Sequence, residues 1–191
     1  MKGYIFDLDG VLVDTAKYHY IAWKTIAKEF NFELTPQHNE QLKGIGREVS
    51  LHQILQWAGK TLSETDFTDT ALRKNKLYLE QISSIDSSEL LPGVLNFLQL
   101  LKAHHKKIAL GSASRNARLV LERTGILPLF DAIVDGTMVS KAKPNPEVFL
   151  KAAEGLMLPP ADCCVFEDAP AGVQAAKSAG MKVIGVGNPE V

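Results

Sequence analysis

Between residues 15 and 88 the apolar positions follow the period of a helix. Three segments have apolar residues every three or four positions, namely 15–30, 47–57 and 63–82. The pair Thr35-Pro36 is typical of a turn or of the start of a further helix. No segment of this block has the composition of a strand. We therefore predict that residues 15–88 are entirely helical.

From Leu90-Leu91-Pro92-Gly93 onward, short apolar runs alternate with helical patterns. The apolar runs that predict strands are 108–111, 132–134, 163–166 and 183–186. The segments that predict helices are 94–104, 116–124, 147–156 and 171–179. This alternation is typical of βα units, which form a parallel sheet with right-handed crossovers. We expect such a sheet to be buried on both faces.

The apolar run Tyr4-Ile5-Phe6 predicts one more strand, which belongs with the later ones. The helical block is then an insertion after the first strand of an α/β fold. We predict a core made of residues 1–14 and 89–191 and a helical cap made of residues 15–88. The two crossings between them form a plausible hinge, so a site between the two bodies can close over its substrate.

Composition excludes several classes of function. The 191 residues carry 21 Lys and Arg against 22 Asp and Glu, a formal net charge of -1, which predicts neither a nucleic-acid nor a membrane partner. The start of the chain has no apolar region of a signal peptide, and no stretch is long enough to span a bilayer. The only cysteines, Cys163 and Cys164, are adjacent, so we expect no disulfide and a reducing cytoplasm.

Two acids end the first strand. Residues two apart on an extended chain point the same way, so Asp7 and Asp9 can face one site. Two close carboxylates repel each other unless a cation or a shared proton compensates. The pair indicates a Mg²⁺ site, an acid/base pair, or both. The alternative is a strand that runs into an acidic surface turn.

Other polar residues follow the later strands, where ligands of open parallel sheets bind. Ser112 and Ser114 follow one strand, Lys143 follows the next, and Glu167-Asp168 follow a third. Each has an ordinary structural alternative: a serine that caps a helix, a solvated lysine, or acids at a helix N-terminus. Together they match a site for Mg²⁺ and phosphate, because carboxylates hold the hard cation while a hydroxyl and an ammonium neutralise phosphoryl oxygens.

These residues resemble the four motifs of the haloacid dehalogenase superfamily. The motifs are Asp7-x-Asp9-Gly10-Val11, Ser112, Lys143-Pro144-x-Pro146 and Glu167-Asp168, in the order of the family. The resemblance covers essentially the whole chain. It implies a Rossmann-like parallel sheet core with helices on both faces and an inserted all-helical cap domain.

The resemblance also implies roles and Mg²⁺ as cofactor. Asp7 would be the nucleophile that takes up the phosphoryl group, and Asp9 the general acid and base. Ser112 and Lys143 would be catalytic residues that hold the transferring phosphoryl group. The implied metal ligands are Asp7, Asp9 through its backbone carbonyl, Glu167 and Asp168. Asp9 argues against a haloacid dehalogenase proper, which lacks this second aspartate.

The cap should select the substrate. Lys43 and Arg47 flank a glycine-containing turn, and Arg47 opens a helix whose N–H groups can bind a phosphate. The alternative is an exposed basic turn. The turn resembles the cap loop of the β-phosphoglucomutases. That resemblance implies substrate contacts or hinge positions at Thr15, His19, Trp23, Lys43, Gly44, Arg47, Ser50, Lys74, Ala113, Ser114, Arg115 and Asn116.

A mutase needs two phosphate pockets, and the basic cap turn is a candidate for the second. The resemblance therefore implies a mutase that interconverts β-D-glucose 1-phosphate and β-D-glucose 6-phosphate through an aspartyl phosphate and β-glucose 1,6-bisphosphate. The alternatives are a hexose-phosphate phosphatase of the same superfamily and a non-catalytic sugar-phosphate sensor. We expect a cytoplasmic monomer with a small sugar phosphate as its ligand.

The resemblance has two departures. Position 115 is Arg where some relatives have lysine, a change that should keep phosphate binding. Relatives usually continue beyond the last strand with another strand and a helix, whereas this sequence ends at Val191. We therefore expect an exposed sheet edge at the last strand.

Overall fold

A computed structural model describes residues 1–187 of the chain. These residues contain one parallel sheet of five strands in the order β3-β2-β1-β4-β5. Its strands are β1 (Gly3–Phe6), β2 (Lys107–Gly111), β3 (Ala132–Val134), β4 (Cys163–Glu167) and β5 (Lys182–Gly185). The sheet confirms the predicted α/β fold with parallel strands.

β1 lies in the middle of the sheet. Ile5 is paired with Ala109 of β2 on one side and with Val165 of β4 on the other, and all three are fully buried. Because all strands run in the same direction, their carboxyl ends lie at one edge. The sequence places Asp7, Ser112 and Asp168 immediately after β1, β2 and β4, and this common edge positions the site.

Helices cover both faces of the sheet, as predicted. One face carries α5 (Val94–Ala103) and α6 (Ala117–Arg123), and the other carries α7 (Glu147–Gly155) and α8 (Pro170–Ser178). Short 3-10 turns join the elements at Ser87–Glu89, Leu127–Leu129 and Pro160–Asp162. On the first face Leu98 packs into one cluster with Leu110, and on the second Phe149 packs with Ile5.

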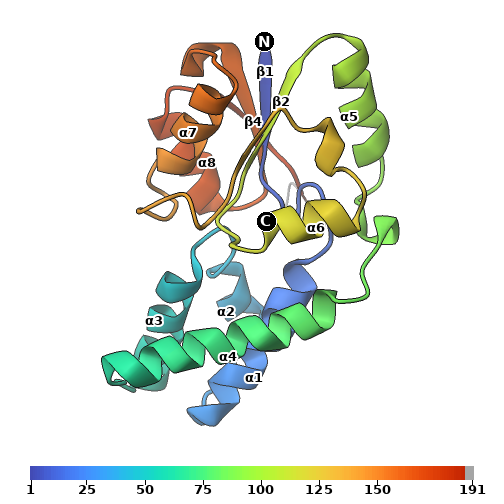
Figure 1. The fold of residues 1–191 in the computed structure, drawn as a ribbon. Helices are drawn as coiled ribbons and strands as arrows, with labels where there is room; N and C mark the ends of the chain where they lie inside the picture. Colours follow the sequence, from blue (N-terminus) through green and yellow to red (C-terminus); the bar gives the residue numbers. More distant parts are fainter. Residues whose placement is uncertain (188–191) are drawn as a thin grey trace.

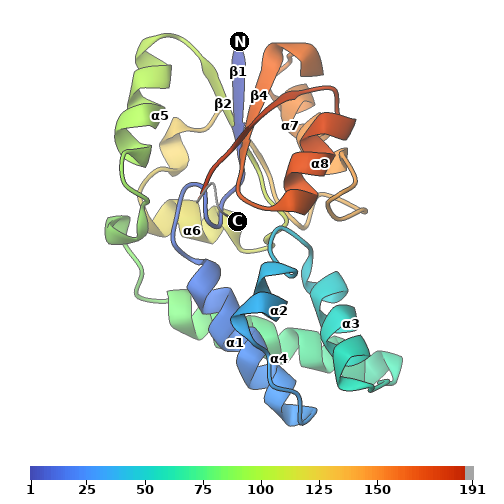
Figure 2. The same cartoon turned by 180° about the vertical axis from the view of Figure 1, so that it is seen from behind.

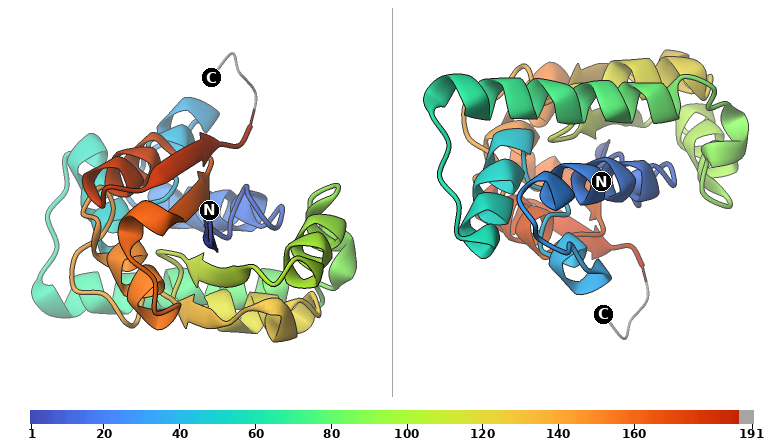
Figure 3. Two further views of the ribbon diagram at one scale, coloured as in Figure 1. Left: turned by 90° about the horizontal axis from the view of Figure 1, so that it is seen from above. Right: turned by 90° about the horizontal axis from the view of Figure 1, so that it is seen from below.

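The remaining helices lie beyond the carboxyl ends of the strands (Figure 1 and, from below, Figure 3). They are α1 (Ala16–Glu29), α2 (Pro36–Glu40), α3 (Arg47–Ala58) and α4 (Glu64–Ile82). Trp23, Leu51 and Ala71 belong to a buried cluster within this group. The segment is helical and contains no described strand, as its periodicity predicts. We call these helices the cap, and the division at residues 14/15 and 88/89 stays a prediction.

Local signals explain where the cap helices begin and end. The Thr35 hydroxyl accepts a hydrogen bond from His38 N, so Thr35-Pro36 starts a helix. α3 ends at Ala58 and is capped by Gly59, whose φ of 62° is left-handed. Ser63 then caps α4 by accepting from Asp66 N.

The expectation that the sheet is buried on both faces is wrong at β5. Ile184 of this strand is 47% exposed. Within residues 1–187, β5 pairs with β4 alone and forms one edge of the sheet, where burial is incomplete (Figure 3, left). The exposed edge expected at the last strand is therefore present within the described residues, while Val191 itself lies outside them. No helix in residues 1–187 combines the length and the apolar character that a membrane crossing needs.

Candidate active site

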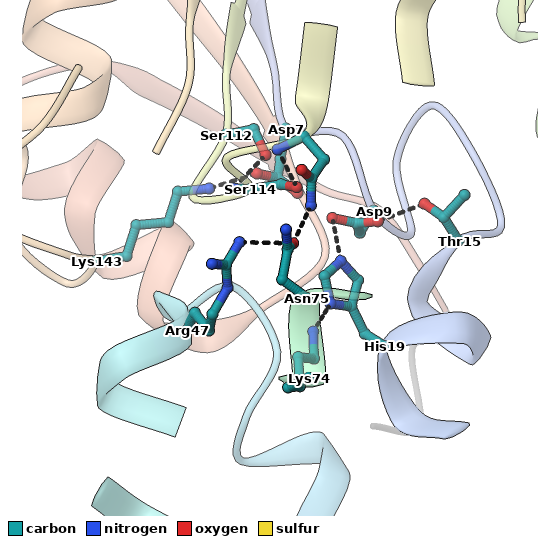
Figure 4. A network of polar contacts seen from close by, with 11 residues as sticks. Asp7, Asp9, Thr15, His19, Arg47, Lys74, Asn75, Ser112, Ser114 and Lys143 are labelled. Atoms are coloured by element: carbon teal, nitrogen blue, oxygen red, sulfur yellow. Dashed lines mark hydrogen bonds and ion pairs between the residues drawn. The ribbon is translucent and has the colours of Figure 1, made fainter. Parts of the chain in front are cut away.

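Lys143 joins two acids at the carboxyl edge of the sheet. Its Nζ donates to Asp7 Oδ1 at 2.6 Å and to Glu167 Oε2 at 2.8 Å, and all three side chains are buried (Figure 4 draws Asp7 and Lys143). Asp7 follows β1, Glu167 ends β4, and Lys143 comes from the segment before α7. Three residues far apart in the sequence thus form one buried ionic group.

Burial and charge act against each other in this group. Burial alone lowers the pKa of Lys143, but the charges of Asp7 and Glu167 outweigh it, so the pKa rises above its usual value. Burial raises the pKa of Asp7 to about 6, although Lys143 opposes the rise. At neutral pH Asp7 is therefore mostly ionised, as a carboxylate nucleophile must be.

Asp7, Glu167 and Asp168 form an acidic cluster. Each offers one oxygen, and these oxygens lie within 4.8 Å of one another. Burial, followed by the charge of Asp7, raises the pKa of Asp168 to about 6. Three carboxylates near one point fit a hard divalent cation, whose charge would offset their repulsion.

Two glycines leave space for the side chains of the acidic cluster. Gly10 has a φ of 82°, and a Cβ there would lie 2.3 Å from Asp168 Oδ2. A Cβ at Gly172 would lie 2.1 Å from the Glu167 carboxyl group. Glu167 also accepts from Ala169 N at 3.1 Å, so one of its oxygens is fixed by the backbone. Side chains at either glycine would displace an acid.

Asp9 has different surroundings from Asp7. The Thr15 hydroxyl donates to its Oδ1, and His19 Nε2 lies 3.8 Å from its Oδ2. Burial, followed by the charge of Asp7, raises the pKa of Asp9 to about 6. Its carboxylate is not part of the acidic cluster. Only its backbone carbonyl stays a candidate metal ligand.

His19 and Lys74 connect Asp9 with the cap. Lys74 Nζ lies 2.6 Å from His19 Nδ1 and sits 4.8 Å from the centre of the Trp23 ring. Burial, followed by the charge of Arg47, lowers the pKa of Lys74 to about 7. Burial and Lys74 also hold the pKa of His19 well below its usual value, so His19 is neutral at neutral pH.

A cavity lies between this edge of the sheet and the cap. Its walls bring together most of the site residues that the sequence predicts. They are Asp7, Asp9, His19, Trp23, Lys43, Gly44, Arg47, Ser50, Lys74, Ser112, Ala113, Ser114, Arg115 and Asn116. Thr15, Lys143 and Glu167 are not wall residues: Thr15 bonds to the wall residue Asp9, and Lys143 bonds to Asp7 and to Glu167. Asp168 stands beside Asp7 in the acidic cluster.

Ser112 and the basic residues are held by neighbours. Ser112 Oγ accepts from Ser114 N at 3.1 Å, so it folds the loop after β2, and Asn116 rather than a serine precedes α6. Lys43 pairs with Glu40 at 2.8 Å, and Arg115 pairs with Glu48 of the cap at 3.0 Å.

Sequence reasoning misses several residues of the site. Further wall residues are Ala16, Asn39, Leu42 and Ile45. Tyr78 stacks on His19 with ring centres 4.0 Å apart. Asn75 accepts hydrogen bonds from both Arg47 and Asn116, each at 2.8 Å. The helical period that places Lys74 and Tyr78 on the buried face of α4 could have indicated Tyr78.

The haloacid dehalogenase-like hydrolase family matches residues 4–186 of this chain. The chain belongs to the haloacid dehalogenase-like hydrolases. A beta-phosphoglucomutase of Bacillus subtilis is 48% identical over 98% of this chain and 84% of its own length. The fructose-1-phosphate phosphatase YqaB of Escherichia coli is 31% identical over 96% of this chain and 95% of its own length.

A solved structure extends the similarity to three dimensions. The beta-phosphoglucomutase of Clostridium difficile superposes with a TM-score of 0.96 at 43% identity, over 100% of this chain and 86% of that chain. The family assignment predicted from the four motifs is confirmed. Among the features of this chain, the basic cap turn and the cavity between cap and core are the ones that bear on the substrate.

Proposed function

We propose that this haloacid dehalogenase-like protein is a mutase that interconverts β-D-glucose 1-phosphate and β-D-glucose 6-phosphate. One observation carries the proposal: a single cavity has the carboxylate of Asp7 in one wall and the cap cations Lys43 and Arg47 in another. A bisphosphate with a phosphoryl group at each end needs both a reactive carboxylate and a separate group of cations. The beta-phosphoglucomutases of Bacillus subtilis and Clostridium difficile support this reading.

Asp7 is the nucleophile in this proposal. Its carboxylate attacks the phosphorus, the bond from phosphorus to the leaving oxygen breaks, and an aspartyl phosphate forms. Lys143 contacts Asp7 at 2.6 Å and can also meet an oxygen of the incoming phosphoryl group. Ser112, buried at the end of β2, offers a hydroxyl to the same group. These contacts let two anions approach.

Asp9 moves the proton. In one half-reaction it protonates the sugar oxygen that leaves, and in the other it removes a proton from the attacking sugar hydroxyl. Its raised pKa of about 6 allows both forms near neutral pH. Thr15 holds one of its oxygens by a hydrogen bond, and the neutral His19 lies next to the other. β-Glucose 1,6-bisphosphate is the intermediate, and it reverses its orientation in the cavity between the two half-reactions.

Mg²⁺ is the proposed cofactor. The oxygens of Asp7, Glu167 and Asp168 would hold it, together with the backbone carbonyl of Asp9. When bound, it would neutralise charge on the transferring phosphoryl group. The donor set fits a cation of this class because it consists of oxygens, which Mg²⁺ prefers to nitrogen and sulfur ligands.

The second phosphate belongs at the cap. Arg47 begins α3 beside the turn at Gly44, and Lys43 and Arg115 stand nearby in the wall. A guanidinium can hold a phosphate by two parallel hydrogen bonds. Trp23 and Ser114 are available for the sugar between the two phosphates. Some relatives are phosphatases, so hydrolysis of the sugar phosphate is the alternative reaction that the following experiment tests.

The test measures two products at once. Protein with Mg²⁺ receives β-glucose 1-phosphate and a trace of β-glucose 1,6-bisphosphate, and glucose 6-phosphate and free phosphate are quantified together. A mutase forms glucose 6-phosphate in large excess over phosphate. Mostly free phosphate would show a phosphatase instead. Bound sugar phosphate without any reaction would favour a sensor.

Asp7→Asn should lower turnover more than about a thousandfold, because the amide cannot act as the nucleophile. Arg47→Ala should lower the ratio of glucose 6-phosphate to phosphate and raise KM. Arg73→Ala is its matched control, since Arg73 is a cap arginine that pairs with Glu29 on the surface, outside the cavity wall. Normal turnover by Asp7→Asn would contradict the nucleophile assignment.

We also propose that the protein acts as a monomer in the cytoplasm. Both the core wall and the cap wall of the cavity come from one chain, so catalysis needs no second subunit. Cys163 and Cys164 are buried free thiols, which suits a reducing compartment. Light scattering of the active protein tests the oligomeric state, and a dimer mass would refute it.

A further inference from the structure

Asn75 links three parts of the molecule through one atom. Its side-chain oxygen accepts from Arg47 Nη2 and from Asn116 Nδ2, both at 2.8 Å. Asn75 belongs to cap helix α4, Arg47 begins cap helix α3, and Asn116 precedes core helix α6. Figure 4 shows Asn75 between Arg47 and the loop of Ser114. The amide therefore bridges the cap and the core at the basic wall of the cavity.

The bridge is placed behind the wall rather than in it. Arg47 and Asn116 both line the cavity, whereas Asn75 is not among the described residues that do. Its side chain is half-buried, and it can fix the direction of the Arg47 guanidinium while leaving other N–H groups free for a phosphate. The bond to Asn116 crosses from cap to core, so both bonds coexist only with the cap closed.

Asn75 is uncharged, and this affects how strongly Arg47 can bind an anion. An amide oxygen orients a guanidinium without cancelling its charge, whereas a carboxylate would form a stronger, charge-assisted pair with it. Burial already lowers the pKa of Arg47, and Glu48 beside it is engaged by Arg115. The Arg47 charge thus stays available to an anion in the cavity.

We propose that Asn75 is a positioning residue that holds Arg47 ready for the distal phosphate of the substrate and couples this readiness to cap closure. The inference rests on the proposed function, in which Arg47 binds that phosphate. Recognition of the second phosphate then depends on a residue that does not touch the substrate. Phosphoryl transfer at Asp7 itself does not depend on Asn75.

Two substitutions separate positioning from mere structural support. Asn75→Ala removes both hydrogen bonds, while Asn75→Asp keeps an acceptor for both but neutralises Arg47. Calorimetry measures glucose 6-phosphate binding to each variant, without turnover. We expect about tenfold weaker binding for Asn75→Ala and a still larger loss for Asn75→Asp. A purely structural acceptor would instead be rescued by Asn75→Asp, and wild-type affinity in that variant would overturn the proposal.

A second experiment uses a phosphoryl donor that has no distal phosphate. Acetyl phosphate should phosphorylate Asp7 in both variants at a rate within about twofold of the wild type. A loss equal to that seen with the sugar phosphate would overturn the proposal, because the defect would not be specific to the distal end. Urea unfolding checks that both variants fold.

Glu48→Gln is the matched control for the bridge. It breaks a different contact between cap and core, the ion pair of Glu48 with Arg115, whose side chain is 47% exposed. Exposed pairs contribute little, so glucose 6-phosphate binding should change less than threefold. A loss as large as that of Asn75→Ala would contradict a special role for Asn75. If the wild type forms no glucose 6-phosphate, the proposed function fails, while calorimetry still decides the role of Asn75.

Discussion

Asp7 and Asp9 are two residues apart and share a raised pKa of about 6, yet their surroundings assign them different chemistry. Asp7 is buried against the ammonium of Lys143, which favours its ionised form. Asp9 meets only a hydroxyl and a neutral imidazole at short range, so it can carry a proton or release it. Neighbours, rather than the intrinsic acidity of the two carboxyl groups, distinguish the proposed nucleophile from the proposed general acid.

Mg²⁺ affinity should fall steeply as the solution becomes acidic. The pKa values of Asp7 and Asp168 are raised to about 6, so both groups are ionised above this pH and take up protons below it. Protons and Mg²⁺ then compete for the same oxygens. We expect calorimetry to show at least about tenfold weaker Mg²⁺ binding at pH 5.5 than at pH 7.5.

Two variants control this pH dependence. Asp168→Asn removes one titrating ligand, so its Mg²⁺ binding should be weak and depend less on pH. Asp14→Asn changes an exposed acid outside the cluster and should behave as the wild type. An Mg²⁺ affinity that is equal at both pH values would contradict the competition.

At this scale the sequence indicates which residues gather, but not how each is used. The position of Asp9 two residues after Asp7 suggests that the neighbouring carboxylate raises its pKa, whereas burial is the larger cause. Burial depends on the cap, which packs over the strand ends only in the folded chain. The double contact of Asn75 likewise joins residues 28 and 41 positions away and leaves no local signal.

At the scale of elements, a glycine in the cap loop allows the cap to approach the core. Gly44 has a φ of 71°, and a Cβ there would lie 2.9 Å from the Cβ of Ala169, in the turn before α8. Gly59 has a similar φ of 62°, but a Cβ there would have no neighbouring atom within 4 Å. The two glycines therefore share a backbone requirement, and only Gly44 also has a packing requirement.

Gly44→Ala should impair closure, whereas Gly59→Ala should not. Both substitutions cost about 1 kcal/mol of stability, because alanine is strained in the left-handed region. In Gly44→Ala the added methyl group also meets Ala169, so KM for the sugar phosphate should rise at least about fivefold. Steady-state kinetics and urea unfolding of both variants test this. Equal kinetic effects in the two variants would refute the packing requirement.

The predicted element bounds agree closely with the structure, and three strands differ at a charged residue. The strand Ala132–Val134 and the start of α7 agree with the apolar pattern. β4, however, extends to Glu167, because its backbone pairs with Gly185. β2 and β5 likewise begin at lysines that a hydrophobic pattern leaves out. Backbone hydrogen bonds continue past the apolar residues, which periodicity does not record.

At the scale of the molecule, the two crossings between core and cap are tied together. Val13 bridges Leu90 in an antiparallel contact, and Asp14 N donates to Glu89 O at 2.9 Å. The Tyr18 hydroxyl adds a hydrogen bond to the Glu89 carboxylate at 2.6 Å. Motion of the cap therefore has to bend both crossings together, as one hinge.

Tyr18→Phe removes one tie of this hinge and keeps the aromatic ring. Because closure both assembles the basic wall and retains the substrate, we expect kcat and KM to change together by about threefold or more. Tyr20→Phe is the matched control, since its hydroxyl donates to Leu34 O within the cap at 3.1 Å. Each variant should lose about 1 kcal/mol of stability with its hydrogen bond. Only Tyr18→Phe should also speed amide hydrogen exchange over residues 86–92, and unchanged exchange there would show that the hinge does not depend on this bond.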